Sequence, residues 1–298
     1  MTQSRARGKP RAVLAIIGGS GLYDLPGLAD VRRERVQTPF GEPSDEIVLG
    51  RLGDTELAFL PRHGKGHRLT PTELNPRANL WALKRLGATR VVSVSAVGSM
   101  KEEIVPGHLV LPTQYIDRTH ARAKSFFGDG IVAHVAFADP VCPLLHDHLR
   151  EACVAAGITA HPQGTYLCIE GPQFSTRAES NLYRSWNVDV IGMTAMPEAK
   201  LAREAELCYA TVALATDYDC WREGHEAVTV AQILQIMERN IRSAREVVRI
   251  AALSLSKLRG RACGCGHALD FAVMTSPAQI PSAARERLGL LLGDRFKA

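Results

Sequence analysis

Two glycine-containing loops of the sequence could bind an anion. The segment Arg62-His63-Gly64-Lys65-Gly66-His67-Arg68 places basic or titratable side chains between glycines, directly after a predicted strand. A guanidinium offers a planar fork to two phosphate oxygens, and an imidazole offers one directional hydrogen bond. The segment Gly18-Gly19-Ser20-Gly21 also follows a predicted strand, and its glycines let backbone N–H groups and a serine hydroxyl approach an anion closely. Phosphate is therefore a candidate ligand for both loops.

Each loop also has an ordinary structural interpretation. A basic loop is commonly a solvated surface segment, and Gly18–Gly21 is equally compatible with a tight turn. Position 24 is Asp24, where a dinucleotide-binding loop would carry a third glycine, and no Gly-Lys-Ser/Thr ending follows the loop. These departures argue against a nicotinamide site and against an ATP-binding loop.

The predicted secondary structure indicates an α/β fold with a single domain. Short runs of Val, Ile, Leu and Ala, bounded by Gly or Pro, alternate with stretches of helical period, which is typical of a central, mixed and largely buried β-sheet flanked by helices. Capping boxes at Thr176/Glu179 and Thr229/Gln232 mark two helix starts. We predict strands at 12–17, 46–52, 56–61, 90–96, 108–115, 164–169, 188–192 and 208–216, and helices at 72–87, 177–186 and 229–258.

The loops that follow these strands are expected to meet. Ligands of open α/β sheets bind at the carboxyl ends of the strands, and the loops at 93–99, 170–175, 192–198 and 216–221 share this placement with the two anion-binding candidates. The last loop contains Asp217 and Asp219. An Asp-x-Asp at a strand end is more often an ordinary loop or a helix cap than a catalytic pair, so it acquires meaning only beside the other motifs.

Composition limits the remaining function classes. Of 298 residues, 46% are hydrophobic and 22% are charged, as in globular proteins, and no apolar run approaches the roughly 18–20 residues of a membrane-spanning helix. The net charge of +5 includes four basic residues in the first eleven, and only 6% of residues are aromatic, so we expect no nucleic-acid binding and no membrane partner. We expect a disordered basic tail at 1–11, one domain at 12–258 and a C-terminal appendage at 259–298.

The cysteines indicate a reducing, cytoplasmic location. Seven cysteines, an odd number, are spread thinly along the chain, and the basic N-terminus lacks the apolar stretch of a secretory signal. Cys263-Gly264-Cys265-Gly266-His267 contains soft metal ligands, but it lacks the paired spacing of a four-ligand zinc site, which a neighbouring subunit would have to complete. We expect a helix-ending turn there and no metal.

Seven short motifs, taken in order, resemble the trimeric purine nucleoside phosphorylases, and within that family most of all the enzymes that act on S-methyl-5′-thioadenosine. The resemblance covers about residues 12–257 and implies a homotrimer that uses no cofactor, with inorganic phosphate as co-substrate. The motifs are Gly18-Gly19-Ser20-Gly21-Leu22, Thr38-Pro39-Phe40-Gly41, Arg62-His63-Gly64, Asn75-Pro76-Arg77-Ala78-Asn79, Glu170-Gly171-Pro172-Gln173-Phe174, Gly192-Met193-Thr194 and Asp217-Tyr218-Asp219-Cys220-Trp221.

The resemblance also implies roles for single residues. Phosphate would be held by Ser20, Arg62, His63, Ser95, Ala96 and Thr194, and the nucleoside by Phe174, Ser175, Met193, Asp217, Asp219, Val230, Ile233 and His134. Ser20 and Ser95 stand where many relatives carry threonine, and either hydroxyl can donate a hydrogen bond. Gly192 stands where some relatives carry asparagine, which removes a side-chain contact.

The aspartate pair fits the chemistry of phosphorolysis. A departing purine becomes a better leaving group if a protonated carboxyl donates to its N7, and burial beside a second carboxylate would raise the pKa of that acid; we assign Asp217 as the acid and Asp219 as its partner. Two carboxyls suit adenine better than a 6-oxopurine, and Val230 with Ile233 suits a methylthio group better than a 5′-hydroxyl. The predicted products are adenine and 5-methylthioribose 1-phosphate. A sibling activity on inosine, adenosine or methylthioinosine and a non-catalytic purine-binding module remain the alternatives.

Overall fold

The computed structural model describes residues 13–222 and 230–296, without the side chains of Ser20, Tyr23, 230–234, Asp294 and Phe296. Its strands are β1 Val13–Gly18, β2 Ala29–Glu34, β3 Ile47–Leu52, β4 Thr55–Pro61, β5 Ala88–Ser99, β6 Leu109–Val110, β7 Gln114–Arg118, β8 Ala160–His161, β9 Thr165–Ile169, β10 Val190–Gly192 and β11 Cys208–Tyr218. Its α-helices are α1 Pro76–Arg85, α2 Pro143–Ala155, α3 Arg177–Ser185, α4 Ala195–Glu204, α5 Val230–Leu253 and α6 Ser282–Leu292.

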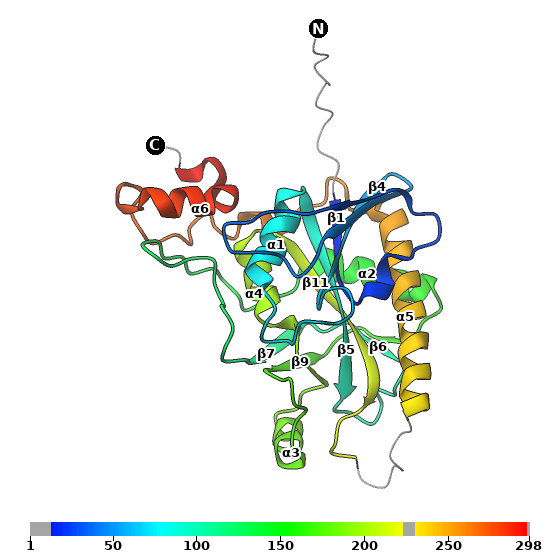
Figure 1. Ribbon diagram of the computed structural model, residues 1–298. Coiled ribbons are helices and arrows are strands. Elements are labelled where there is room, and N and C mark those ends of the chain that lie inside the picture. The colour runs from blue at the N-terminus through cyan, green and yellow to red at the C-terminus, as the bar shows by residue number, and fades with distance from the viewer. Residues whose placement is uncertain (1–12, 223–229, 297–298) are drawn as a thin grey trace.

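These strands form one mixed sheet with helices on both faces (Figure 1). The main path runs β2-β3-β4-β1-β5-β10-β9-β7. Outside that path, β11 pairs with β5 and with β6, and β6 pairs with β8. β1 is parallel to β4 and β5, and β11 is parallel to β5. The predicted α/β class, with a mixed sheet flanked by helices, is confirmed.

Side-chain alternation along the central strands divides the core into two layers. Ala15 and Ile17 of β1 face one apolar cluster together with residues of α1, α4 and α6, while Leu14 and Ile16 face another together with residues of α2 and α5. Successive residues of a strand point to opposite faces, so a strand buried on both faces is apolar throughout, as β1 is. The segment after residue 258 contributes to the first layer through Ile280, Ala284 and Leu288.

Most predicted elements exist, with two informative errors. The strand predicted at 108–115 is two strands, β6 and β7, because Pro112 lacks an N–H donor and interrupts the ladder; β6 pairs with β11, whereas β7 pairs with β9. The helix predicted at 72–87 begins at Pro76, where the Asn75 side chain accepts from the backbone N–H of Ala78.

Several elements were missed from the sequence. β2 is an exposed edge strand without alternating hydrophobicity, and α2 and α4 begin directly after a loop without a side-chain cap. The long helix α5 ends at Leu253, and a 3-10 turn at Leu255–Leu258 completes the predicted span. Within the described residues, no helix combines the length and the apolar character needed to traverse a bilayer.

Candidate active site

The carboxyl ends of β1, β4, β5 and β11 lie at one edge of the sheet, as their parallel pairing requires. This edge lies toward α3 at the bottom of Figure 1. The backbone N–H of Arg62 donates to the carbonyl of Gly18 at 2.9 Å, so the loops after β4 and β1 are directly joined. The expected convergence of the anion-binding loops is therefore observed.

Arg62 lies beneath this edge, almost fully buried, with all three side-chain nitrogens against protein acceptors. Its Nε and Nη2 donate to the two carboxylate oxygens of Glu198, each at 3.2 Å. Further bonds from Nη1 and Nη2 reach the carbonyls of Val94 and Ile17, at 2.7 and 3.2 Å, and the Ser93 hydroxyl, at 2.7 Å. Burial opposes the charge, but Glu198 raises the pKa of Arg62, so the guanidinium stays protonated. Its hydrogen bonds join β1, β5 and α4 inside the protein.

Glu198 was not identified from the sequence as a functional residue. It is buried in the first turns of α4, and its Oε1 also accepts from the Tyr209 hydroxyl at 2.9 Å. A carboxylate at a fully buried position needs paired charge and hydrogen bonds, and Arg62 with Tyr209 supplies both. The signal available was its place at the end of the 192–198 motif, directly after a predicted strand.

His63 is neutral in this environment. Burial, opposed by a hydrogen bond to the Leu69 carbonyl, lowers the pKa of His63 to about 4. Its Nδ1 lies 2.8 Å from the Leu69 oxygen and must carry the hydrogen, since that partner can only accept. Nε2 is then a hydrogen-bond acceptor. It can accept from a phosphate hydroxyl, or take a proton when a bound anion raises its pKa.

Three buried hydroxyls lie close together, near Arg62. The oxygens of Ser95, Thr194 and Tyr166 are inaccessible to solvent and have no hydrogen-bond partner within the described part of the chain. Burial raises the pKa of Tyr166 to about 12, and the nearby Ser95 and Thr194 hydroxyls act against that rise. Unsatisfied buried hydroxyls cost free energy, so a cluster of them is suited to a ligand with several acceptor oxygens. Ser95 and Thr194 were predicted to hold phosphate, whereas Tyr166 was not identified.

Gly192 has a packing role that sequence comparison alone did not indicate. A Cβ at this position would lie 2.1 Å from the Tyr166 hydroxyl oxygen and 2.7 Å from its ring carbon Cζ. Any side chain at position 192 would therefore displace the tyrosine. The expectation that Gly192 merely removes a contact was incomplete, because the glycine makes room for a third hydroxyl in the cluster.

The two aspartates lie at the end of β11 with different surroundings. Burial and the neighbouring Asp219 raise the pKa of Asp217, while a hydrogen bond from the Thr216 hydroxyl to its Oδ1, at 2.6 Å, acts against the rise. Asp219 is buried, and its Oδ2 accepts a hydrogen bond from the Ser180 hydroxyl of α3. The raised pKa favours the protonated form of the Asp217 carboxyl.

A β-bulge sets the direction of this pair. The register between β11 and β5 shifts between Ala215 and Asp217, so Thr216 is the extra residue. The backbone N–H of Asp219 then donates to the Ser99 carbonyl at 3.0 Å, which fixes the segment after the strand. Bulges commonly redirect a side chain at a functional edge, and this one lies directly before Asp217.

The remaining predicted ligand-binding residues differ in burial and in the residues that they contact. Met193 packs against Gly171, where a Cβ would lie 2.5 Å from its sulfur, and the Ser175 hydroxyl is buried without a partner in the described residues. Ala96 is exposed at the edge, and Phe174 is 85% exposed. His134 is exposed, and its backbone N–H donates to the Ala272 carbonyl at 2.8 Å. None of its recorded contacts within this chain is to the aspartate pair or the hydroxyl cluster.

Three predicted residues fall outside the described side chains. Ser20 lies in the 3-10 turn Ser20–Tyr23, and Val230 and Ile233 lie in the first turn of α5; only their backbones are described. Their roles stay predictions.

Arg122 and Glu170 form a second buried ion pair that the sequence did not reveal. Arg122 Nε donates to Glu170 at 3.0 Å, and Arg122 Nη1 donates to the carbonyls of Met193 and Met196. Burial would raise the pKa of Glu170, but hydrogen bonds from Thr72, from two backbone N–H groups and from Arg122 lower it to about 2. The pair joins the 170–175 and 192–198 loops.

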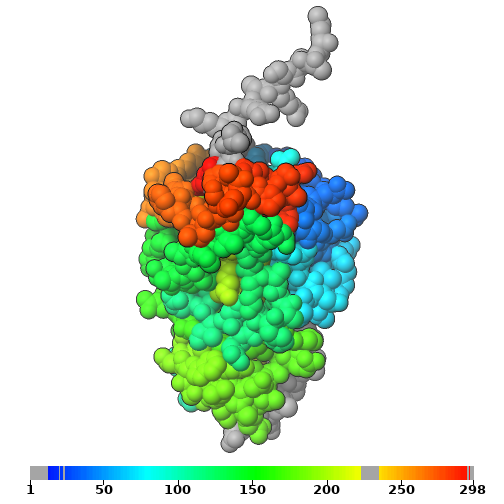
Figure 2. Space-filling model, turned by 90° about the vertical axis from the view of Figure 1, so that its left-hand side faces the viewer, coloured from blue at the N-terminus to red at the C-terminus, as the bar shows by residue number. Residues whose placement is uncertain are grey.

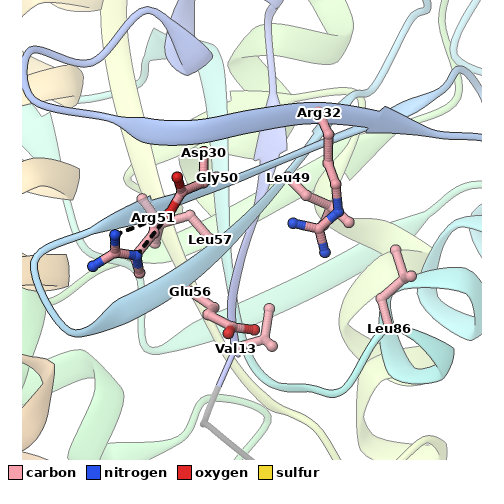
Figure 3. A pocket seen from close by; sticks show the side chains of 9 residues that line it. All are labelled: Val13, Asp30, Arg32, Leu49, Gly50, Arg51, Glu56, Leu57 and Leu86. Carbon is pink, nitrogen blue, oxygen red and sulfur yellow. Dashed lines mark hydrogen bonds and ion pairs between the residues drawn. The ribbon is translucent and has the colours of Figure 1, made fainter. Parts of the chain in front are cut away.

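A separate surface cavity lies at the opposite, amino end of β1, beside Val13 and Leu86 (Figure 3). Arg51 Nε donates to Asp30 at 2.9 Å within it, and Arg32 and Glu56 complete its polar lining. None of the predicted site residues lines this cavity, so it is distinct from the candidate active site.

Comparison with known proteins points to one family. A model of the phosphorylase superfamily matches residues 13–252. The chain is 58% identical to S-methyl-5′-thioadenosine phosphorylase of Geobacter sulfurreducens, over 95% of this chain and 98% of the relative, and 56% identical to that of Koribacter versatilis, over 96% and 97%.

Solved structures agree with these relatives. A methylthioadenosine phosphorylase from an antarctic soil metagenomic library superimposes with a TM-score of 0.91 at 49% identity, covering 95% of this chain and all of the other. An adenosine/methylthioadenosine phosphorylase mutant of Schistosoma mansoni, in complex with adenine, superimposes with a TM-score of 0.78 at 36% identity, covering 83% and 92%.

Replacing Arg62 by methionine is expected to destabilise the fold. The substitution strands Glu198 as a buried, uncompensated charge, which costs about 3–5 kcal/mol of unfolding free energy. Chemical denaturation measures the unfolding free energy of the variant and of the wild type. The control Arg35→Met removes a solvent-exposed partner of Glu46 and should cost about 0.5 kcal/mol or less. Equal, small losses in the two variants would contradict the structural role of Arg62.

Proposed function

This chain belongs to the phosphorylase superfamily, and on that premise we infer that it catalyses phosphorolysis of S-methyl-5′-thioadenosine, yielding adenine and 5-methylthioribose 1-phosphate. The observation that carries this conclusion is the 58% identity to a relative of that activity across nearly the full length of both chains. The enzyme is a pentosyltransferase: it moves a 5-methylthioribosyl group from adenine to phosphate. Several of the side chains expected for this transfer lie at the carboxyl edge of the sheet.

We propose that the phosphate nucleophile occupies the hydroxyl cluster. Ser95 and Thr194 would donate to phosphate oxygens, the exposed Ala96 segment would approach it, and Ser20 would close the site from the loop after β1. Three buried hydroxyls without protein partners support this assignment, since phosphate oxygens accept several hydrogen bonds at once. We propose the Tyr166 hydroxyl as a third donor to phosphate, because it too is buried without a partner in the described residues.

We propose separate contributions for Arg62 and His63. We propose that Arg62 acts on phosphate mainly through its charge and by holding the carboxyl edge of the sheet, because its observed hydrogen bonds go to Glu198, backbone carbonyls and Ser93. Neutral His63 would accept a hydrogen bond from the remaining proton of HPO4²⁻ through Nε2. That contact would orient a fully ionised oxygen toward the sugar.

We propose that the aspartate pair stabilises the departing base. A phosphate oxygen forms a bond to the anomeric carbon C1′ while the bond from C1′ to N9 of the base breaks, and the electron pair of that bond remains on the purine. We propose that Asp217 donates its proton to N7 and that Asp219 accepts from the exocyclic amine. The Thr216 hydroxyl occupies Oδ1 of Asp217, so Oδ2 is the oxygen available to carry the proton. No further cofactor is proposed, because phosphate itself supplies the nucleophile.

We propose that the 5′ end of the substrate is bound between subunits of a homotrimer. Val230 and Ile233 would supply an apolar lining, and His134 would come from a neighbour. Support comes from the surface around His134: Phe271 is 98% exposed, Met274 67% and Val132 48%. Backbone hydrogen bonds connect this strip, from Met274 to Val132 and from His134 to Ala272. Figure 2 shows the C-terminal segment lying directly above the green segments on this face. Contiguous exposed apolar surface commonly marks an interface.

Asp217→Asn is expected to lower kcat for methylthioadenosine by about 10²–10⁴-fold, because an amide cannot transfer a proton to N7. Adenine release, followed by chromatography, measures the change, and circular dichroism checks folding. Asp54→Asn, in an exposed turn between β3 and β4, is the control and should retain full turnover. Wild-type rates in the Asp217 variant would remove this residue as the acid.

The pH dependence of kcat should follow the same acid. The pKa of Asp217 is raised above its ordinary value of 3.8, and the protonated form is the active one, so activity is present below that raised pKa and is lost as pH rises through it. Measured at saturating phosphate, wild type should show this alkaline decline and Asp217→Asn should not. The same decline in both proteins would assign it to another group.

A nucleoside panel tests substrate preference. We expect kcat/KM for methylthioadenosine to exceed that for inosine and methylthioinosine by about 10- to 100-fold, because two carboxyls leave a 6-oxopurine without a donor to O6. Adenosine shares the adenine base and tests the 5′ pocket alone. Faster turnover of inosine would contradict the assigned use of the aspartates, and no phosphate-dependent adenine release would indicate a binding protein.

A further inference from the structure

Four cysteines from separate parts of the chain meet at the end of the sheet opposite the active site. Cys142 precedes α2, Cys208 begins β11, and Cys263 and Cys265 belong to the turn after residue 259. The four sulfur atoms all lie within 4.8 Å of one another, and the Cys208 and Cys263 sulfurs are 3.4 Å apart. None of these thiols is bonded to another. Four soft ligand atoms therefore surround one point.

This spacing matches a tetrahedral metal centre. Zinc binds thiolate sulfur at about 2.3 Å, which places the sulfurs of a tetrahedral four-thiolate site about 3.8 Å apart. Two disulfides would instead bring each sulfur within about 2.05 Å of a single partner. Tetrahedral sites with four sulfur ligands bind zinc or iron, and zinc needs no redox partner to be retained. The arrangement favours one zinc ion over two cross-links.

The surroundings suit a closed structural site. Cys142 and Cys265 are buried in the apolar layer beneath α2 and α5, and Cys208 and Cys263 pack against that layer. Cys142 is also the N-cap residue of the 13-residue helix α2, where the positive end of the helix dipole favours a thiolate. Its backbone N–H donates to the Tyr209 carbonyl at 2.9 Å, which holds the start of α2 against β11.

The expectation that a neighbouring subunit would have to complete the Cys263–Cys265 pair was wrong. Cys142 and Cys208 of the same chain complete it, although they are 121 and 55 residues away from Cys263 in sequence. His267, the third soft ligand of the local motif, instead pairs with Asp270, at 2.9 Å. Sequence spacing did not reveal the set because the fold, not the local motif, brings its halves together.

We propose that Cys142, Cys208, Cys263 and Cys265 bind one zinc ion as a four-thiolate structural site. Each thiol loses its proton on binding, so loading the site releases protons to solvent. The ion attaches the segment after residue 259 to the beginning of β11. Asp217 follows Cys208 by nine residues of the same strand, or about 30 Å, so the metal takes no part in phosphorolysis. The inference is independent of the proposed reaction.

Metal content of the wild-type chain is the first test. Protein purified with a thiol reductant and without a histidine tag should contain about one zinc per chain by elemental mass spectrometry. Removing zinc with an organomercurial reagent and a chelator should expose four additional thiols once the reagent is reversed. Cobalt loading should give the visible absorption of a tetrahedral thiolate complex. These readouts do not depend on any variant folding.

Two variants assign the ligands. Cys263→Ser/Cys265→Ser should reduce bound zinc to below about 0.1 per chain and lower the thermal midpoint. Cys153→Ser is the matched control, since Cys153 is buried in α2 within the same apolar layer but is outside the cluster, and it should keep its zinc. The double variant should still fold, because Glu206 binds both the Leu269 N–H and Arg295 and so provides a second anchor for the C-terminal segment.

Three results would overturn the proposal. They are a reduced wild-type chain that stays free of zinc after zinc is supplied, disulfides among the four cysteines in protein alkylated before any oxidation, and a double variant that retains its zinc. Iron in place of zinc would overturn the choice of metal. Loss of phosphorolysis in Asp217→Asn with zinc retained would leave this site unaffected, so failure of one proposal is distinguishable from failure of the other.

Discussion

The buried pair of Arg62 and Glu198 is the interaction on which the active-site edge depends. One guanidinium joins α4 to the end of β1 and to the middle of β5, and Arg62 itself directly follows β4. A buried charge is tolerated only where its donors are all satisfied, so these elements have little freedom to move relative to one another. The buried hydroxyls and carboxylates at this edge of the sheet are held by the same elements.

Close to this pair, a cluster of buried hydroxyls has no hydrogen-bond partners within the described residues. Ser95, Thr194 and Tyr166 bring three hydroxyls together without satisfying them, and Gly192 keeps the space that Tyr166 needs. Burying a hydroxyl without a hydrogen-bond partner costs free energy, and in the proposed function the oxygens of phosphate would offset that cost. Burial and the neighbouring Asp219 oppose ionisation of Asp217 in a comparable way.

Strand β11 links two kinds of chemistry at opposite ends. Asp217 lies near its end and Asp219 directly follows it, whereas its first residue, Cys208, lies in the four-thiol cluster. The bulge before Asp217 redirects the end of a strand whose middle is buried on both faces. The Ser180 hydroxyl of α3 donates to Asp219 directly after the strand and so holds the segment that contains the two aspartates against α3.

The sequence by itself determined the fold class, most strands, and the loops that meet at the carboxyl edge, because hydrophobic period and strand-end placement are local properties. The raised pKa of Asp217 was also predictable, since an adjacent carboxylate is visible in Asp-x-Asp. Only tertiary structure decided that Arg62 faces Glu198, that Tyr166 joins Ser95 and Thr194, that His63 is neutral, and that four distant cysteines surround one point. Each of these depends on which side chains become neighbours when the sheet forms. Burial and charge pairing act between residues that are close in space, and the spacing of residues along the chain does not reveal such contacts.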